Sequence, residues 1–468
     1  MAEATLLARR LANFRRGATP VPVQSDESRA AGRQRSLALA VRMADELDGE
    51  CVATPLGTVV RVERPLHPMA IDRASLALLP GQPPPGVPLV CLDTETTGLA
   101  TAAGTVAFLV GVGWWEGQRF RQVQLVLPDH SEEPALLEML ASLIPAHAWL
   151  VTYNGRSFDW PLLITRYRMI GRGGPPHAGH LDLLTTVRRL FRHRMADARL
   201  RTAEEVLLGF GRVDDVEGWE IPGRYLAFLR GGSAAPLAPV LEHNERDVRS
   251  LARILVHLTE ELADEDRRRE APDGDLLGLA RAFRRDGRLE EAMSCLETAV
   301  SRPTGAGSGP RRRSTGPAPS WLVDRSDGVA SAIAELSRAR AQRLTRDQVA
   351  RERARLLRHV GRAADARQAW QELAARNGPL AAIAWVELAK LLEHQERDLA
   401  GALQAVASAE RLAHHSALIG RPLPELEADL ARRRARLLRR AGTTGKGDAV
   451  PLRGLAVGEG IAQAVTHR

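Results

Sequence analysis

Cysteine, lysine and long apolar runs are all scarce in this chain of 468 residues. The three cysteines, Cys51, Cys91 and Cys295, are widely spaced and lack the paired C-x-x-C spacing that zinc sites use. The longest strongly apolar run, residues 106–115, is far shorter than the roughly 20 residues that a membrane-spanning helix needs. The first residues also lack the apolar core of a secretory signal. We therefore expect a cytoplasmic protein in a reducing compartment, with no membrane contact.

Almost all of the basic residues of the chain are arginines. Only two of its 65 basic residues, Lys390 and Lys446, are lysines, and the formal net charge is +8. This excess suits an anionic partner such as nucleic acid. The hydrophobic share of 44% and the charged share of 26% are those of ordinary globular proteins and exclude a disordered polyelectrolyte. At roughly 100–200 residues per domain, the length predicts two to four domains.

The N-terminal half predicts an α/β domain after a short leader. Residues 1–50 read as a poorly ordered basic segment, and 51–87 as a β-hairpin followed by a proline-rich linker. Three successive strands are predicted at residues 88–97, 105–115 and 119–128, and helices alternate with short strands from there to residue 262. The pattern favours a mixed sheet flanked by helices, over residues 88–262.

The C-terminal half predicts helical hairpins. Segments near residues 276–300, 354–373 and 388–409 carry small and apolar residues at positions similar to the 34-residue tetratricopeptide (TPR) pattern. We expect one TPR-like unit at 272–304, a disordered linker at 305–322, further TPR-like repeats at 323–440 and a disordered tail at 441–468. Such repeats usually form a protein-binding surface. The arginine-rich run 431–440 either contacts nucleic acid or places favourable charge at the end of a helix.

Five residues from three distant segments are candidates for catalysis. Asp93 and Glu95 lie two apart on a predicted strand, so both project from the same face, where they would repel unless a divalent cation compensated them. Asp159 follows an N-G-R-S-F turn at the start of a helix, where a helix-dipole role is the simple alternative. His243 and Asp247 lie four apart on one helical face, a spacing that also suits a surface contact.

Together and in this order, these motifs resemble the DEDD 3′–5′ exonucleases of the ribonuclease H-like superfamily, and most closely the YprB-type ribonuclease H-like domain. The resemblance covers roughly residues 88–262. It implies that Asp93, Glu95, Asp159 and Asp247 hold two divalent ions, Mg²⁺ or Mn²⁺, and that His243 is the general base. Oxygen ligands suit these hard cations, and a histidine can take a proton near neutral pH. Two such ions can stabilise both the attacking and the leaving oxygen of a phosphodiester.

The chain departs from the family pattern at the base. The histidine subclass usually has four residues between His and Asp, whereas three separate His243 from Asp247, the spacing at which the tyrosine subclass has its tyrosine. Whether His243 or another group is the base is therefore left open. Four further residues are candidates for substrate binding, each with a structural alternative: Tyr153, Asn154, Arg156 and Asp182.

The leading functional hypothesis is a metal-dependent 3′–5′ exonuclease acting on single-stranded nucleic acid, with a C-terminal protein-interaction region. One alternative is a non-catalytic nucleic-acid-binding scaffold. Another is an endonuclease on structured nucleic acid, because the same metal chemistry can cut internally. The fold alone does not choose among them, and neither DNA nor RNA is indicated.

Overall fold

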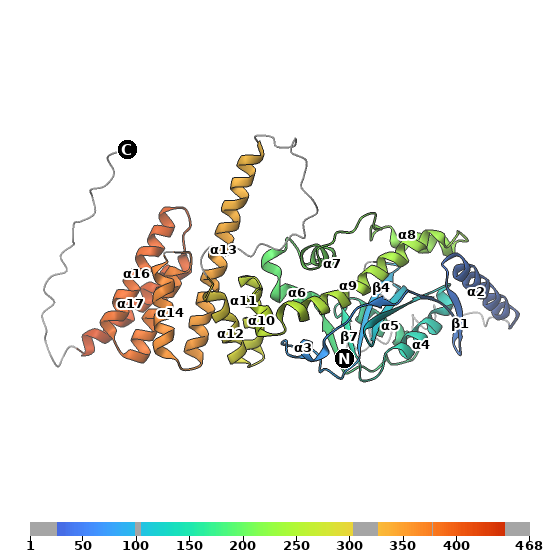
Figure 1. Cartoon of the computed structure of the whole chain (residues 1–468), viewed down its shortest axis with the longest axis horizontal. Coiled ribbons are helices and arrows are strands. Elements are labelled where there is room, and N and C mark those ends of the chain that lie inside the picture. The colour runs from blue at the N-terminus through green and yellow to red at the C-terminus, as the bar shows by residue number, and fades with distance from the viewer. Residues whose placement is uncertain (1–25, 99–103, 303–325, 377, 445–468) are drawn as a thin grey trace, which may run out of the picture. The chain divides into compact units, whose positions relative to one another are not determined.

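The computed structural model describes residues 26–98, 104–302, 326–376 and 378–444 (Figure 1). The chain divides into two compact units, with the boundary between Asp286 and Gly287.

An eight-stranded mixed sheet is the centre of the first unit. Its order is β1-β2-β6-β5-β4-β7-β8, and the short β3 pairs with β6. The central strand β4 is antiparallel to β5 and parallel to β7, which is parallel to β8. The strand bounds are β1 Glu50–Thr54, β2 Gly57–Glu63, β3 His67–Pro68, β4 Leu89–Thr96, β5 Ala107–Glu116, β6 Arg119–Val126, β7 Trp149–Thr152 and β8 Gly179–Asp182.

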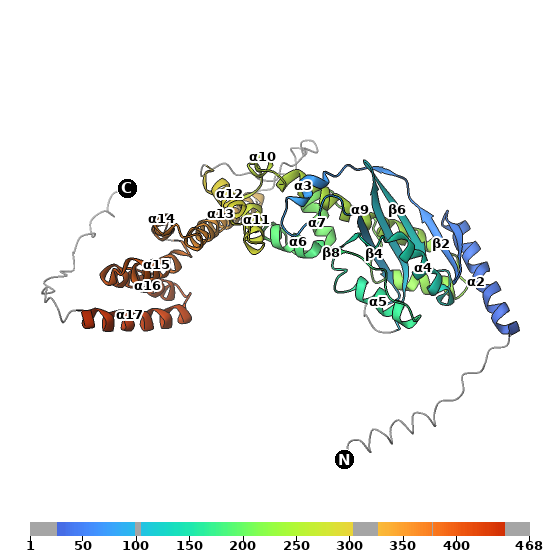
Figure 2. The same cartoon turned by 90° about the horizontal axis from the view of Figure 1, so that it is seen from below.

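Helices cover both faces of this sheet. The long helix α9 crosses one face, and α4 and α5 lie over the other (Figures 1 and 2). The helical segments of the first unit are α2 Asp26–Glu46, α3 Arg73–Ala77, η1 His130–Glu132, α4 Glu133–Leu143, α5 Asp159–Met169, α6 Leu183–Leu190, η2 Arg192–Arg194, α7 Leu200–Ala203, η3 Glu204–Leu208, α8 Ile221–Leu229, η4 Ala235–Leu237, α9 Ala238–Leu262, α10 Glu265–Arg268 and α11 Asp273–Arg285.

The start of β4 is buried because both faces of the sheet are covered. Leu89, Val90, Cys91 and Leu92 are at most 3% exposed, as the nearly continuous apolar run predicts for a central strand. The polar residues begin at Asp93, where the strand approaches the edge at which the site lies. The α/β prediction, a mixed sheet flanked by helices, is confirmed.

The structure corrects the expected N-terminal boundary of this domain. Residues 26–46, predicted to be poorly ordered, form α2, whose Ala40 and Met43 are completely buried in the core. The predicted hairpin is β1–β2, but it is part of the main sheet because β2 pairs with β6. Local patterns could not show this pairing, since the partners are more than sixty residues apart in the register Val60↔Val126.

The second unit is helical. Its elements are α12 Leu289–Val300, α13 Ser326–His359, α14 Ala363–Ala375, α15 Ala381–Leu391, η5 Leu392–Glu396, α16 Leu399–Leu418 and α17 Pro424–Thr444. Successive helices from α12 to α17 pack against one another in chain order. Gly361 has a positive φ of 80° in the turn between α13 and α14, and Trp370 of α14 is completely buried. The predicted all-α region of helical hairpins is confirmed.

The unit boundary differs from the predicted one. The expected unit at 272–304 is divided, because α11 belongs to the first unit and α12 to the second. The expected linker at 305–322 lies outside the described residues, as does the expected tail from residue 445 onward. Within the described part of the chain, no helix combines the length and the apolar character needed to cross a membrane.

Candidate active site

Strand β4 and helix α9 supply the centre of the candidate site. Asp93 and Glu95 are two apart on β4, so their side chains leave the same face of the sheet. Asp93 is paired across the ladder with Gly111 of β5. A Cβ atom at Gly111 would lie 2.2 Å from Oδ1 of Asn244 on α9. Glycine at this position therefore permits the close approach of α9 to the carboxylates of β4.

Asn244 connects the helix to the strand. It is completely buried, and its Nδ2 donates a hydrogen bond of 2.9 Å to Oδ2 of Asp93. Its Oδ1 accepts a hydrogen bond of 2.8 Å from Nε2 of Gln124 on β6. A buried amide with both ends satisfied has a fixed orientation. Asn244 thus fixes the position of the Asp93 carboxylate relative to α9.

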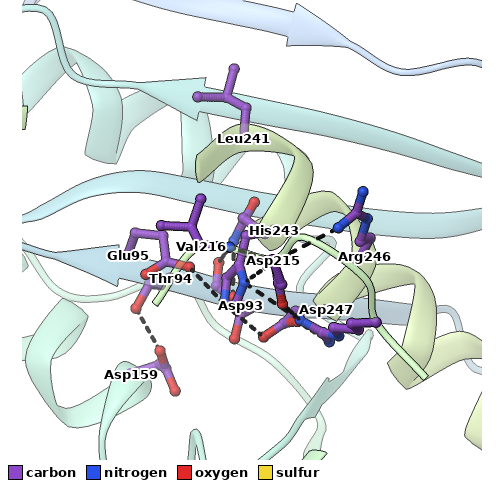
Figure 3. Close-up of polar contacts among 12 residues, drawn as sticks. Asp93, Thr94, Glu95, Asp159, Asp215, Val216, Leu241, His243, Arg246 and Asp247 are labelled. Carbon is purple, nitrogen blue, oxygen red and sulfur yellow. Dashed lines mark hydrogen bonds and ion pairs between the residues drawn. The ribbon is translucent and has the colours of Figure 1, made fainter. Parts of the chain in front are cut away.

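His243 lies between three carboxylates (Figure 3). Its Nδ1 is 2.8 Å from Oδ1 of Asp215, in the loop before α8. Its Nε2 is 3.9 Å from Oε1 of Glu95 and 3.8 Å from Oδ2 of Asp247. In the tautomer in which Asp215 accepts the Nδ1 proton, Nε2 keeps the lone pair that a general base needs.

Arg212 compensates part of the negative charge from inside the protein. Its guanidinium donates two hydrogen bonds, of 2.7 and 2.6 Å, to the fully buried Glu204. It donates a third of 2.9 Å to Asp215 and a fourth to Oδ1 of Asp247. Its side chain is only 4% exposed. The Glu204 and Asp247 carboxylates raise the pKa of Arg212 although burial opposes this, so the cation is permanent.

Asp159 belongs to the same group but has a different partner. It is the first residue of α5, and its Oδ1 accepts a hydrogen bond of 2.5 Å from the hydroxyl of Thr94. In Figure 3 it lies below Thr94, apart from His243, Asp215 and Asp247. Its charge nevertheless contributes to the raised pKa of both Asp93 and Glu95.

The site is a cluster of acidic side chains that are largely buried from solvent. Burial raises the pKa of Asp93 and Glu95, and the charges of Asp247 and Asp159 raise both further. Burial also raises the pKa of Asp159 and of Asp247. Asp215 differs: hydrogen bonds from His243 and Arg212 lower its pKa despite its burial. A divalent cation would stabilise the ionised forms of the four predicted ligands.

The donor set fits a hard divalent cation in its chemistry. Among the described residues, however, no three His, Cys, Asp or Glu side chains converge closely enough to ligate one ion. Asp93, Asp159 and Asp247 instead accept hydrogen bonds from Asn244, Thr94 and Arg212, respectively. The fold thus brings carboxylates of β4, α5 and α9 into one region. Within it, these carboxylates are hydrogen-bonded to protein side chains.

Three of the four predicted substrate contacts, Tyr153, Asn154 and Arg156, lie in the turn that leads from β7 into α5, and the fourth, Asp182, ends β8 beside it. Asp182 accepts hydrogen bonds from the backbone N–H groups of Asn154, Arg156 and Leu184, at 2.8, 3.3 and 3.0 Å. Asn154 has a positive φ of 67°. The hydroxyl of Tyr153 donates to the carbonyl of Ala198 at 2.7 Å, and Arg156 donates to that of His180 at 2.7 Å. These contacts shape the turn that positions Asp159, and substrate binding by the four residues stays a prediction.

Several members of the site were not predicted from the sequence. Thr94 and Asn244 lie inside the D-T-E and H-N-E-R-D motifs, so their neighbours were a signal for them. Arg212, Asp215 and Glu204 carried no such signal. The first two come from the irregular loop G-R-V-D-D-V, and Glu204 from the adjoining η3, so neither strand nor helix periodicity indicated which side chains point inward.

Two comparisons with known proteins agree with this geometry. Residues 90–259 match the family model of the RNase_H superfamily. Over 218 residues the chain is 35% identical to the "Uncharacterized protein YprB" of Bacillus subtilis (strain 168), which covers 46% of this chain and 52% of the relative. The chain thus spans about half the length of the curated relative it matches. The mixed sheet and its flanking helices are consistent with the ribonuclease H-like fold that the match over residues 90–259 indicates.

Proposed function

We propose that the first unit is a metal-dependent nuclease that removes nucleotides from the 3′ end of single-stranded nucleic acid. One observation carries the proposal: acidic side chains from β4 and α9, far apart in the chain, lie around His243, and Asp159 of α5 is close enough to affect the pKa of Asp93 and Glu95. The match to the RNase_H superfamily supports nuclease activity. The 3′–5′ direction comes from the resemblance to the DEDD exonucleases alone.

Asp93, Glu95, Asp159 and Asp247 are the residues that would hold two divalent ions, Mg²⁺ or Mn²⁺. Bound ions would supply positive charge at the phosphate and lower the pKa of a water molecule. The proposal requires the Asp247 carboxylate to be shared with, or released by, Arg212. Arg212 would remain attached to Glu204 and Asp215, so its charge would stay beside the phosphate as a further stabilising group.

His243 is the proposed general base. In the hydrolysis, the oxygen of water attacks phosphorus, the bond from phosphorus to the 3′ oxygen breaks, and Nε2 of His243 takes the proton of the water. The departing 3′ oxygen takes a proton from solvent. Asp215 holds the Nδ1–H of His243, so that Nε2 faces the carboxylates with its lone pair free. Tyr153 is the less suitable base, since its hydroxyl is donated to Ala198 and burial raises its pKa above the usual value.

The second unit is proposed to be a set of TPR-like repeats that binds a protein partner. Stacked helices with small buried residues, such as Ala366, Ala402 and Ala409, allow the close helix packing that such repeats use. Cytoplasmic localisation is part of the same proposal, since Cys51 and Cys91 are free thiols, as is usual in a reducing compartment.

The activity is tested with the full chain, Mg²⁺ or Mn²⁺, and end-labelled single-stranded and duplex DNA and RNA. Stepwise shortening of a 5′-labelled strand supports the proposal. Internal fragments would establish the endonuclease instead, and metal-independent retention of the strand without cleavage would establish the scaffold.

Asp93→Asn and Asp247→Asn are expected to lower turnover by at least about 10³-fold, because each removes charge that metal-assisted hydrolysis needs. They should also abolish the increase in melting temperature that Mn²⁺ gives the wild-type protein. Glu242→Gln is the matched control, since Glu242 is also on α9 but its side chain is 59% exposed. Wild-type turnover in either aspartate variant would refute the site.

A further inference from the structure

The second unit contains a basic cavity to which the proposed function gives no role. Its volume is about 370 Å³, within the range of small-ligand sites. Helix α13, the α15–η5 segment and α17 contribute its walls. The lining residues are Arg358, Lys390, Leu391, His394, Gln395, Arg433 and Arg436.

Cations outnumber carboxylates around this cavity. Glu387 pairs with Arg358 at 2.9 Å and with Lys390 at 2.6 Å. The fully buried Glu393 is contacted by arginines of α17 at 3.5, 2.6 and 2.7 Å, and Asp429 lies 3.6 Å from the first of them. The side chains in these pairs are Arg358, Lys390, Arg433, Arg436 and Arg440 against Glu387, Glu393 and Asp429. In these pairs, five cationic side chains face three carboxylates.

Arg433 is a largely buried cation in the wall of this cavity. Its side chain is only 9% exposed, and its buried Nε–H has no hydrogen-bond acceptor among the described residues. A buried donor without an acceptor costs free energy, so native structures rarely leave one. An anion in the cavity would lie beside more cationic than anionic side chains.

The positive charge continues along α17 beyond the cavity. From Ala431 to Thr444 this helix has six arginines and no acidic residue. Arg432 and Arg434 are 72% and 59% exposed. A row of guanidinium groups suits a ligand with repeated anionic groups, and each group can bind a phosphate through two parallel N–H donors. No Phe, Tyr or Trp side chain is among the described residues that line the cavity, so bases would find no large aromatic surface there.

We propose that this cavity binds the phosphate backbone of single-stranded nucleic acid, with no preference for base sequence. The choice of nucleic acid over an acidic peptide rests on the proposed function of the first unit, whose substrate is the same polyanion. The second unit would then hold the strand as well as a protein partner. The ligand is recognised through its phosphates, so DNA and RNA are both accepted.

The test compares two double variants of the full chain that lose the same charge. Arg358→Gln with Arg436→Gln removes one cation from each side of the cavity, and each buried carboxylate keeps a partner, Glu387 with Lys390 and Glu393 with Arg440. Arg362→Gln with Arg367→Gln is the control, since these two lie on or beside α14 and do not line the cavity. Circular dichroism checks that both variants are folded.

Binding of fluorescein-labelled oligo(U) and oligo(dT) of about 20 nucleotides is measured by anisotropy in EDTA, where metal-dependent cleavage is blocked. The cavity variant is expected to bind about tenfold more weakly, and its slope of log Kd against log salt should fall by about 1.4, the value for two lost phosphate contacts on a single strand. The control should change Kd less than about threefold.

Equal affinities of the two variants would overturn the proposal. It would also be overturned if an oligoglutamate peptide, and not the oligonucleotides, bound with dependence on Arg358 and Arg436. Because binding is measured without cleavage, a catalytically inactive protein that still showed cavity-dependent binding would refute only the proposed function.

Discussion

At the scale of single residues, the candidate site depends on side chains that orient the predicted catalytic residues through hydrogen bonds. Asn244 holds Asp93, Thr94 holds Asp159 and Asp215 holds His243. None of these three contacts was predicted from the sequence, although each partner was. Motif residues can be recognised by type and spacing, whereas a side chain that orients them is defined only by the three-dimensional packing.

Asp215 gives the sharpest prediction at this scale, as a positioning residue. Asp215→Asn replaces the carboxylate on Nδ1 of His243 by a neutral amide, so the imidazole loses its fixed orientation and tautomer. We expect kcat to fall roughly 100-fold, the size of a lost general-base contribution, while KM changes less than about threefold. Calorimetric titration should show unchanged Mn²⁺ affinity, since Asp215 is not among the proposed ligands.

Asp214→Asn is the control for this variant. Asp214 is adjacent in the chain and exposed, and it makes none of the contacts of the site. A KM that rises in parallel with the loss of kcat in Asp215→Asn would show a role in substrate binding and contradict the positioning role.

At the scale of elements, sequence patterns located most of the structure that carries the site. The strand with D-x-E is β4, the helix after the N-G-x-x-F-D turn is α5, and the helix with H-N-x-x-D is α9. What the patterns could not provide was the pairing of β2 with β6 and the path of the loop at 209–220. Long-range register and irregular backbone are set by tertiary contacts, for which periodicity is no guide.

The contact between β5 and α9 gives the second prediction. Gly111→Ala places a Cβ atom 2.2 Å from Oδ1 of Asn244, whose hydrogen bonds to Gln124 and Asp93 would have to shift. Overpacking of this kind costs about 1–3 kcal/mol of the free energy of unfolding. Hydrogen exchange of the α9 amides, followed by mass spectrometry, measures the loss, and nuclease turnover should fall with it.

Gly223→Ala is the matched control for this packing argument. Gly223 is an exposed glycine of α8, and a Cβ atom there would meet no atom within 4 Å. Alanine at an exposed helical position should stabilise the protein by about 0.5–1 kcal/mol. Equal protection of α9 in Gly111→Ala and wild type would show that the strand–helix contact is looser than the structure has it.

At the scale of the whole molecule, buried ionisable groups link folding to pH. Burial lowers the pKa of His180, His193 and His257 to about 4, whereas it raises that of Asp275 to about 7. As the pH falls from about 6.5 to about 4, these histidines destabilise the folded protein. The unfolded chain binds protons on them in this range, whereas the folded protein does not. Asp275 acts in the opposite direction, since only the folded protein holds its proton. The pH dependence of the free energy of unfolding therefore does not report on any single group. A comparison of the wild type with a variant that lacks one of these groups is needed.

His257 allows such a comparison, because its role is confined to the core of the first unit. Its ring lies 6.1 Å from that of Phe191, its Nε2 is buried without a partner among the described residues, and the charge of Arg194 adds to the effect of burial. The unfolded chain protonates this histidine near its usual pKa of about 6.5, but the folded protein does so only near pH 4. His257→Leu removes this difference and leaves every other titrating group in place. The variant should therefore gain about 2 kcal/mol on the wild type as the pH falls from about 7.5 to about 4.5, most of it below about pH 6.5. Hydrogen exchange of the α9 amides at several pH values measures the two free energies of opening, and parallel curves for the two proteins would mean that His257 is solvated in the folded state.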